Sequence, residues 1–299
     1  MAAQLPSAAM IPGAPPLLPP LVSSRRLRAQ SLSRTLRLWV PAGLLILLAG
    51  MCFLLPIIIT IPPPTGGSIL DANAPLFSPG HILGADPVGN DVFSRICYGG
   101  RIAFEVSLAV TAIGMASGCL IGITAGYFGG WVDTILSRVL DVLIAFPALV
   151  LTIAIAEGLQ PSEFHTILAL LVFSVPAFGR ISRAATLAVR ELPFILAARL
   201  SGTGGWRVMV RHVVPNIVPS IATFSLLGIG IVIIIEGALD FLGYGIQPPA
   251  PSWGNMIAQG QTVMDVQPQY VLVPSLFLLA MVVAVNALGD ALRERWGVR

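Results

Sequence analysis

Six long apolar stretches constrain this chain more than any other feature of its sequence. Each is long enough to cross a hydrocarbon core of about 30 Å as a helix, which takes about 20 apolar residues. Charged residues make up only 10% of the chain, against about 25% in ordinary globular domains. The sequence therefore predicts an all-α membrane protein with six transmembrane helices. These fall at 38–61, 103–125, 135–156, 166–188, 217–239 and 270–288.

The distribution of arginine predicts the orientation of these helices. Arginines are frequent before the first stretch, between the second and third, between the fourth and fifth, and after the sixth, whereas the alternate connections carry more acidic residues. Because basic loops stay on the cytoplasmic side, both termini are expected in the cytoplasm. The expected segments are a cytoplasmic tail over 1–37 (rich in Pro and Ala, then in Arg), a first transmembrane helix over 38–61, an external loop over 62–102, a five-helix core over 103–290 and a cytoplasmic tail over 291–299.

Residues 190–216, between the fourth and fifth stretches, form an Arg-rich segment interrupted by glycines. Arginines alternate with apolar residues, so much of the segment reads as amphipathic helix. Ser201–Gly205 is expected to break it, and Pro215 to stop it. An exposed helix–turn–helix on the cytoplasmic side suits docking to a soluble partner. The alternative is an interfacial helix whose arginines face lipid phosphates.

The residue types present exclude several functions. All 17 basic residues are arginine, and a P-loop needs a lysine to reach the nucleotide phosphates. The chain therefore cannot hold an intact Walker A site, is not expected to be an enzyme, and needs no cofactor of its own. The three His and three Cys show no metal-ligand spacing, so no metal site is expected. The net charge of +3 is placed as expected for a membrane protein, not for nucleic-acid binding.

Three acidic residues fall in or near the apolar stretches, where ionisable groups are functional candidates. Glu236 is expected either to face a transport pathway or gate, or to pair with an arginine or a neighbouring helix. Asp141 follows Arg138 and Glu105 follows Arg101 at helical spacings, which predicts local ion pairs.

The external segment 241–268 is rich in Gly and Pro and contains Trp253 and Asn255. It is expected to be shaped by turns. It could contact an external binding protein through these two residues, or it could cap the helices.

Several ordered blocks resemble the permease subunits of bacterial ABC importers for dipeptides and oligopeptides, second-permease type. They are GADPVGNDVFSR at 84–95, AGYFGGWVD at 125–133, DVLIAFP at 141–147, FLGYGIQPP at 241–249 and PSWGNM at 251–256. Segment 190–216 is similar to the family's EAA signature, with Ala197, Ala198, Gly202 and Pro215 at matching positions. Leu196 stands where that signature has Glu, and Ala85 and Asn90 stand where Thr and Arg are usual.

The resemblance implies a type I ABC importer permease fold in the bacterial plasma membrane, with a cytoplasmic coupling helix. It implies four kinds of partner: a second permease, two ATPase subunits or domains that bind the ATP, an external substrate-binding protein, and the lipid bilayer. The expected ATPase-coupling residues are Ala197, Ala198, Arg199, Gly202, Thr203, Trp206 and Arg207. Peptide import is the expected function. The alternatives are another substrate such as nickel, or an ion-coupled secondary transporter.

Overall fold

The computed structural model describes residues 24–297, with side chains from Leu36 onward. The parts of the two predicted tails at 1–23 and 298–299, Arg299 included, lie outside the described residues. The chain divides into two compact units, Met1–Leu36 and Arg37–Arg299. The second unit contains the helices described below, and their bounds are α1 Ser24–Ala49 (which begins in the first unit), η1 Gly50–Leu54, α2 Leu55–Ile58, η2 Ile69–Asp71, α3 Val92–Phe128, α4 Gly130–Ile144, α5 Ala148–Glu157, α6 Glu163–Arg190, α7 Pro193–Leu200, α8 Gly205–Val208, η3 Met209–Val213, α9 Val214–Phe241, α10 Trp253–Gly260, η4 Gln261–Val263 and α11 Gln269–Trp296.

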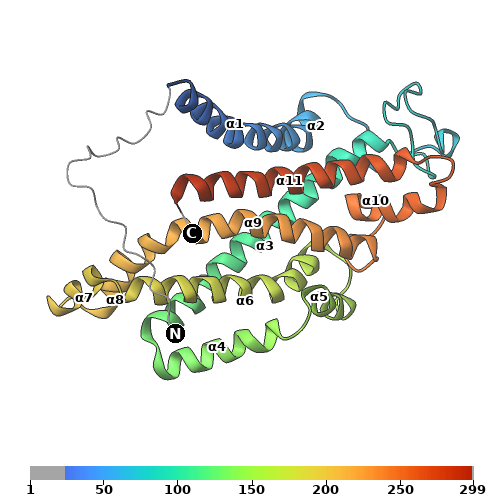
Figure 1. The fold of residues 1–299 in the computed structure, drawn as a ribbon. Helices are drawn as coiled ribbons and strands as arrows, with labels where there is room; N and C mark the ends of the chain where they lie inside the picture. Colours follow the sequence, from blue (N-terminus) through green and yellow to red (C-terminus); the bar gives the residue numbers. More distant parts are fainter. Residues whose placement is uncertain (1–23, 298–299) are drawn as a thin grey trace, which may run out of the picture. The chain divides into compact units, whose positions relative to one another are not determined.

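Within the described residues, five helical runs are long and apolar enough to cross a membrane: Leu36–Ile58, Val92–Phe128, Glu163–Arg190, Gly205–Phe241 and Gln269–Trp296. The pair α4 and α5 makes a sixth if the two are counted as one broken span. The predicted all-α, six-span fold is thereby confirmed. Segments α7 and α8 lie at one end of the bundle formed by α3, α6, α9 and α11, and α10 lies at the other end (Figure 1).

The predicted bounds are too short at both ends of several spans. Helix α3 begins at Val92, not at 103, because the carboxylate of Asp91 accepts a hydrogen bond from the Ser94 backbone N–H and caps the helix. The loop that precedes α3 therefore ends at Asp91 in the structure. The extra turns carry polar and charged residues, so a search for apolar stretches does not include them.

The third predicted span is bent by 82° between α4 and α5. The break falls at Ala145–Pro147, and Pro147 serves as the N-cap of α5 in an extended conformation. Proline has no N–H to continue the α4 ladder and disfavours a helical conformation in the residue before it. The two halves therefore meet at an angle beside α6.

Pro215 does not stop the helix that precedes it, which corrects the sequence interpretation. The run is helical from Gly205 to Phe241, through α8, the π-helical turn η3 and α9. Pro215 lies just after the π-helical turn η3, and the helix continues through it. The side-chain amide of Asn216 donates to the His212 carbonyl at 2.7 Å.

Helices α3 and α6 make the most extensive contact between two helices, along a row of small residues. Gly114, Gly118, Gly122 and Gly126 recur every fourth residue on one face of α3. A Cβ on Gly118 would lie 2.7 Å from the Cβ of Phe178, and one on Gly126 would lie 2.9 Å from the Arg183 carbonyl oxygen. Only glycine fits at this approach, which is the small-residue packing typical of membrane helices.

Two ion pairs join α4 to α6. The Arg183 Nη2 donates to Asp133 Oδ2 at 2.7 Å, and the Arg180 Nη2 donates to Asp141 Oδ1 at 3.0 Å. The prediction that Asp141 pairs with Arg138 on its own helix is therefore wrong. The interhelical geometry of α4 and α6, which the sequence spacing does not contain, brings Arg180 to it. The predicted pair of Arg101 and Glu105 is present, at 2.9 Å.

Candidate functional site

The segment with the predicted coupling residues folds into a short helix and a tight turn at one end of the bundle (Figure 1). Helix α7 begins at Pro193, whose fixed φ suits the first helical position. It ends where Gly202 adopts a φ of +78°, which L side chains rarely adopt. The Ser201 hydroxyl donates to the Ala197 carbonyl, and the Thr203 N–H donates to that of Ala198. The bond from Thr203 satisfies a carbonyl that the helix end leaves open, and the Ala197 carbonyl also accepts the Ser201 N–H.

One face of α7 is anchored to the transmembrane helices. Ile195 is fully buried in a cluster with Tyr127, at the end of α3, and with Met209 and Val213 of η3. The guanidinium of Arg199 lies over the ring of Tyr127, 5.0 Å from its centroid. Helix α7 is thus fixed to α3 and to the long run that leads into α9.

The opposite face of this segment is exposed and apolar. Leu200 is 80% exposed, Trp206 66% and Leu196 58%. Of the predicted coupling residues, Ala198 and Thr203 are half-buried, and the exposed ones are Ala197, Arg199, Gly202, Trp206 and Arg207. The structure therefore brings all seven together on one short segment. An uncharged Leu196 lies within the exposed apolar surface.

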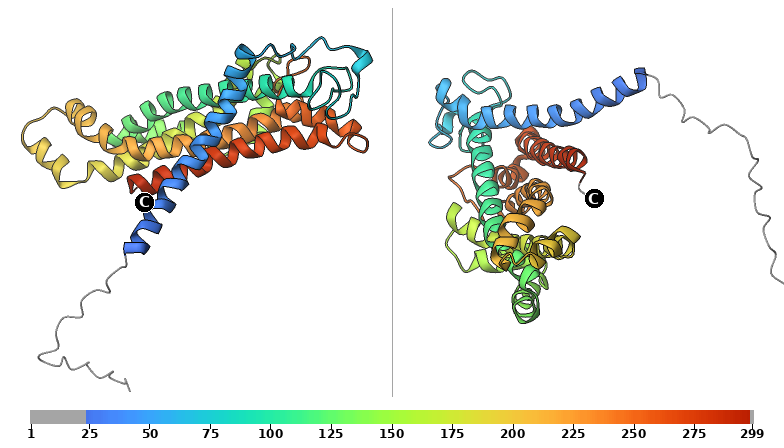
Figure 2. Two further views of the ribbon diagram at one scale, coloured as in Figure 1. Left: turned by 90° about the horizontal axis from the view of Figure 1, so that it is seen from above. Right: turned by 90° about the vertical axis from the view of Figure 1, so that its left-hand side faces the viewer.

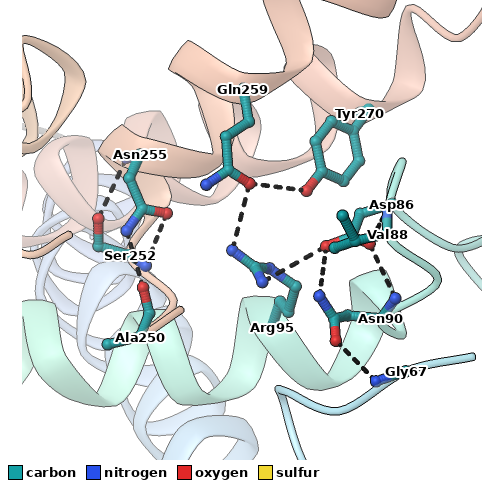
Figure 3. Close-up of polar contacts among 10 residues, drawn as sticks. All are labelled: Gly67, Asp86, Val88, Asn90, Arg95, Ala250, Ser252, Asn255, Gln259 and Tyr270. Carbon is teal, nitrogen blue, oxygen red and sulfur yellow. Dashed lines mark hydrogen bonds and ion pairs between the residues drawn. The ribbon is translucent and has the colours of Figure 1, made fainter. Parts of the chain in front are cut away.

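A second cluster lies at the other end of the bundle, in the first external segment predicted from the sequence (Figure 3). Asp86 and Arg95 form an ion pair at 3.4 Å with both side chains buried. Asp86 also accepts hydrogen bonds from the backbone N–H groups of Val88 and Asn90 and from the Asn90 amide. The Arg95 guanidinium donates to Gln259 of α10, and the Tyr270 hydroxyl donates to the same Gln259 oxygen.

This polar cluster ties the loop before α3 to α10 and α11. In the same loop, the Asn90 side-chain oxygen accepts from the Gly67 N–H at 2.9 Å. Our sequence interpretation noted the block at 84–95 but assigned no contacts to it. The close spacing of Asp86, Asn90 and Arg95 could have indicated that these three side chains interact. Their partners on α10 and α11 are far away in the sequence, so spacing could not indicate those contacts.

The family described as "Binding-protein-dependent transport system inner membrane component" matches residues 118–298. This chain belongs to that family. The permease is 40% identical over 217 residues to the glutathione transport system permease protein GsiD of Pectobacterium atrosepticum, covering 73% of this chain and 72% of the relative. It is 36% identical over 214 residues to the dipeptide transport system permease protein DppC of Alkalihalophilus pseudofirmus, covering 72% and 70%.

The fold of the permease also matches a solved structure. A chain from the inward-facing MetNI methionine ABC transporter superposes with a TM-score of 0.57 at 14% sequence identity, covering 67% of this permease and 95% of that chain. The predicted type I ABC importer permease fold is confirmed. The family makes the permease a multi-pass membrane component of a transport system.

Glu236, the predicted pathway or gate residue, is buried in the permease. It lies on α9 one turn before Asp240, which is also buried. Among the described residues, Glu236 Oε1 and Asp240 Oδ2 have no hydrogen-bond partner, whereas Asp240 Oδ1 accepts from the Ile246 N–H at 2.6 Å. A role at a gate stays a prediction. In this structure the Glu236 carboxyl lies in the protein interior.

Trp253 and Asn255 are both buried, at 2% and 3% exposure, so neither side chain can reach a binding protein in this structure. The Trp253 indole N–H donates to the Ile96 carbonyl of α3 at 3.0 Å. Asn255 closes a capping box with Ser252 and donates to the carbonyls of Ile246 and Ala250 (Figure 3). These residues begin a helix, α10, in a segment expected to consist of turns. The contacts fit the alternative reading, a cap over the helices.

Proposed function

We propose that this permease imports short peptides across the bacterial plasma membrane, with both termini in the cytoplasm and ATP hydrolysed by partner subunits. The relatives are named for glutathione and dipeptide transport, and both of these cargoes are short peptides. Nickel is the alternative substrate, and family membership removes the support for an ion-coupled secondary transporter. The proposed partners are a second permease, two ATPase subunits and an external binding protein.

The observation that carries this proposal is the two-faced α7. Ile195 and Arg199 fix one face to α3 and η3, while Leu196 and Leu200, together with Trp206 of α8, leave an apolar surface open. A rigidly anchored helix with an open apolar face suits the transfer of force from a docked subunit. Closure of the ATPase dimer would then move the transmembrane helices as rigid bodies.

Reconstitution tests the proposal. The permease is co-purified with its second permease and ATPase subunits, placed in proteoliposomes and supplied with loaded binding protein. We expect uptake of a labelled dipeptide that needs ATP, and ATP hydrolysis that the loaded binding protein stimulates. Uptake driven by an ion gradient without ATP, or ATP-dependent uptake of Ni²⁺ but not of peptide, would contradict it.

A further inference from the structure

A cavity of about 630 Å³ lies beside the break between α4 and α5, against α6 and α9. Phe146 at the break, Phe173 on α6 and Phe224 on α9 give it aromatic walls. Arg180 is the charged residue among those that line it. The cavity thus combines apolar walls with one cationic side chain.

The ion pair of Arg180 and Asp141 lies beside this cavity. Arg180 belongs to Glu163–Arg190, one of the runs long and apolar enough to cross a membrane. The two side chains are nevertheless 58% and 51% exposed. Charged groups within a membrane span face other protein or water rather than lipid, because hydrocarbon solvates them poorly. This face is therefore turned away from lipid.

The neighbouring pair on the same two helices provides a contrast. Arg183 and Asp133 are 33% and 19% exposed, make two hydrogen bonds with each other, and are absent from the cavity lining. That pair joins α4 to α6. The Arg180–Asp141 pair adds one hydrogen bond between α4 and α6, and Arg180 lines the cavity.

We infer that this cavity is a subsite of the transport pathway that takes the terminal carboxylate of a short peptide on Arg180. The inference rests on the proposed function and adds a recognition residue to it. A guanidinium binds a carboxylate with two parallel N–H donors, and the aromatic walls accept an apolar side chain. Between transport cycles Asp141 neutralises Arg180. By competing for Arg180, Asp141 also keeps the cargo weakly held, as a pathway site requires.

The test compares a labelled dipeptide, alanyl-phenylalanine, with its C-terminal amide in the reconstituted transporter. The same binding protein delivers both to every variant, so its own preference cancels when variant and wild type are compared. We expect Arg180→Gln to raise the KM for the free peptide about tenfold, since a charge-assisted hydrogen bond is lost. The KM for the amide should stay within about twofold, because it has no carboxylate to lose.

Arg183→Gln is the matched control. It also removes a guanidinium from α6, but Arg183 is not among the residues that line the cavity. It should lower the yield of complex without changing the ratio of the two KM values. Should Arg180→Gln not assemble, Asp141→Asn gives a second test. With the competing carboxylate removed, the KM for the free peptide should fall and that for the amide should not.

Equal effects on free and amidated peptide in the Arg180 and Asp141 variants would overturn the inference. The same ratio change in Arg183→Gln would also overturn it, as would a cross-link showing that the second permease fills the cavity. Each result leaves peptide import intact. The absence of ATP-dependent peptide uptake by the wild-type transporter would instead refute the proposed function.

Discussion

The guanidinium of Arg199 on α7 lies 5.0 Å from the centroid of the Tyr127 ring, which belongs to the last turn of α3. The two residues are far apart in the sequence, and their contact joins the proposed coupling helix to a transmembrane helix. A cation over an aromatic face contributes about 0.5–1 kcal/mol at an exposed site. This energy is small, and the importance of the contact is that it connects α7 to α3.

Replacing Tyr127 with Leu should weaken coupling without removing ATPase docking. The substitution removes the ring under Arg199 but leaves the exposed face of α7 in place. We expect peptide transported per ATP hydrolysed to fall about threefold or more, while the ATPase still co-purifies. Tyr127→Phe keeps the ring and should behave as wild type. Equal losses in both variants would show that the hydroxyl, not the ring contact, is what matters.

Trp206→Ala should weaken docking of the ATPase subunit. Trp206 is 66% exposed on the open face, and a buried interface tryptophan contributes about 2 kcal/mol or more to binding. Affinity for the ATPase should fall at least about tenfold, with the melting temperature of the permease unchanged. Trp131→Ala is the control, since Trp131 is 82% exposed outside the coupling segment. A similar loss of affinity in Trp131→Ala would show that Trp206 has no specific role in docking the ATPase.

Arg95→Met should destabilise the permease strongly. Removing one partner of a buried ion pair leaves the other charge uncompensated, at a cost of about 3–5 kcal/mol. Both Asp86 and Arg95 are buried, so thermal unfolding in detergent should shift down by several degrees. The matched control is Arg101→Met, which removes an exposed partner of Glu105 and should cost about 1 kcal/mol or less. Equal shifts would mean that the Asp86–Arg95 pair is not stabilising.

Gly118→Ala should disrupt the packing of α3 on α6. Its Cβ would clash with the Val175 carbonyl oxygen and lie 2.7 Å from the Cβ of Phe178. Overpacking of this kind costs about 1–3 kcal/mol. Gly43→Ala on α1 has nothing within 4 Å of its Cβ and should be neutral or slightly stabilising. A thermal shift scan of both variants decides the point, and a neutral Gly118→Ala would mean that the two helices can separate at no cost.

Much of the fold follows from local sequence, because a membrane span needs a long apolar stretch and these stretches are easily identified in the sequence. The bend at Pro147 and the continuous helix through Pro215 were missed or misjudged, because the effect of a proline depends on which turn it occupies. The seven coupling residues were found because they are contiguous. The partners of Arg95 and Asp141 were not found, because contacts between residues far apart in the sequence produce no regular spacing in it.

The small-residue packing of α3 could have been predicted. Glycines at positions 114, 118, 122 and 126 repeat every fourth residue, a pattern typical of close helix pairs in membranes. The α6 residues that face these glycines also recur every fourth residue: Ser174, Phe178, Ser182 and Thr186. The burial of Trp253 and Asn255 could not have been read from composition, because Gly- and Pro-rich segments can be exposed or packed equally well.

The central claim, that the open face of α7 docks an ATPase subunit, is tested most directly by cross-linking from Leu200→Cys. Leu200 is 80% exposed, whereas the native Cys52 and Cys97 are buried and Cys119 is half-buried, so the new thiol is the most accessible one. A short bifunctional maleimide–amine reagent is applied to the assembled transporter, with Val266→Cys, 82% exposed beyond α10, as the control. The account predicts a covalent permease–ATPase adduct from Leu200→Cys and none from Val266→Cys. No adduct from Leu200→Cys, or an ATPase adduct from Val266→Cys, would contradict it.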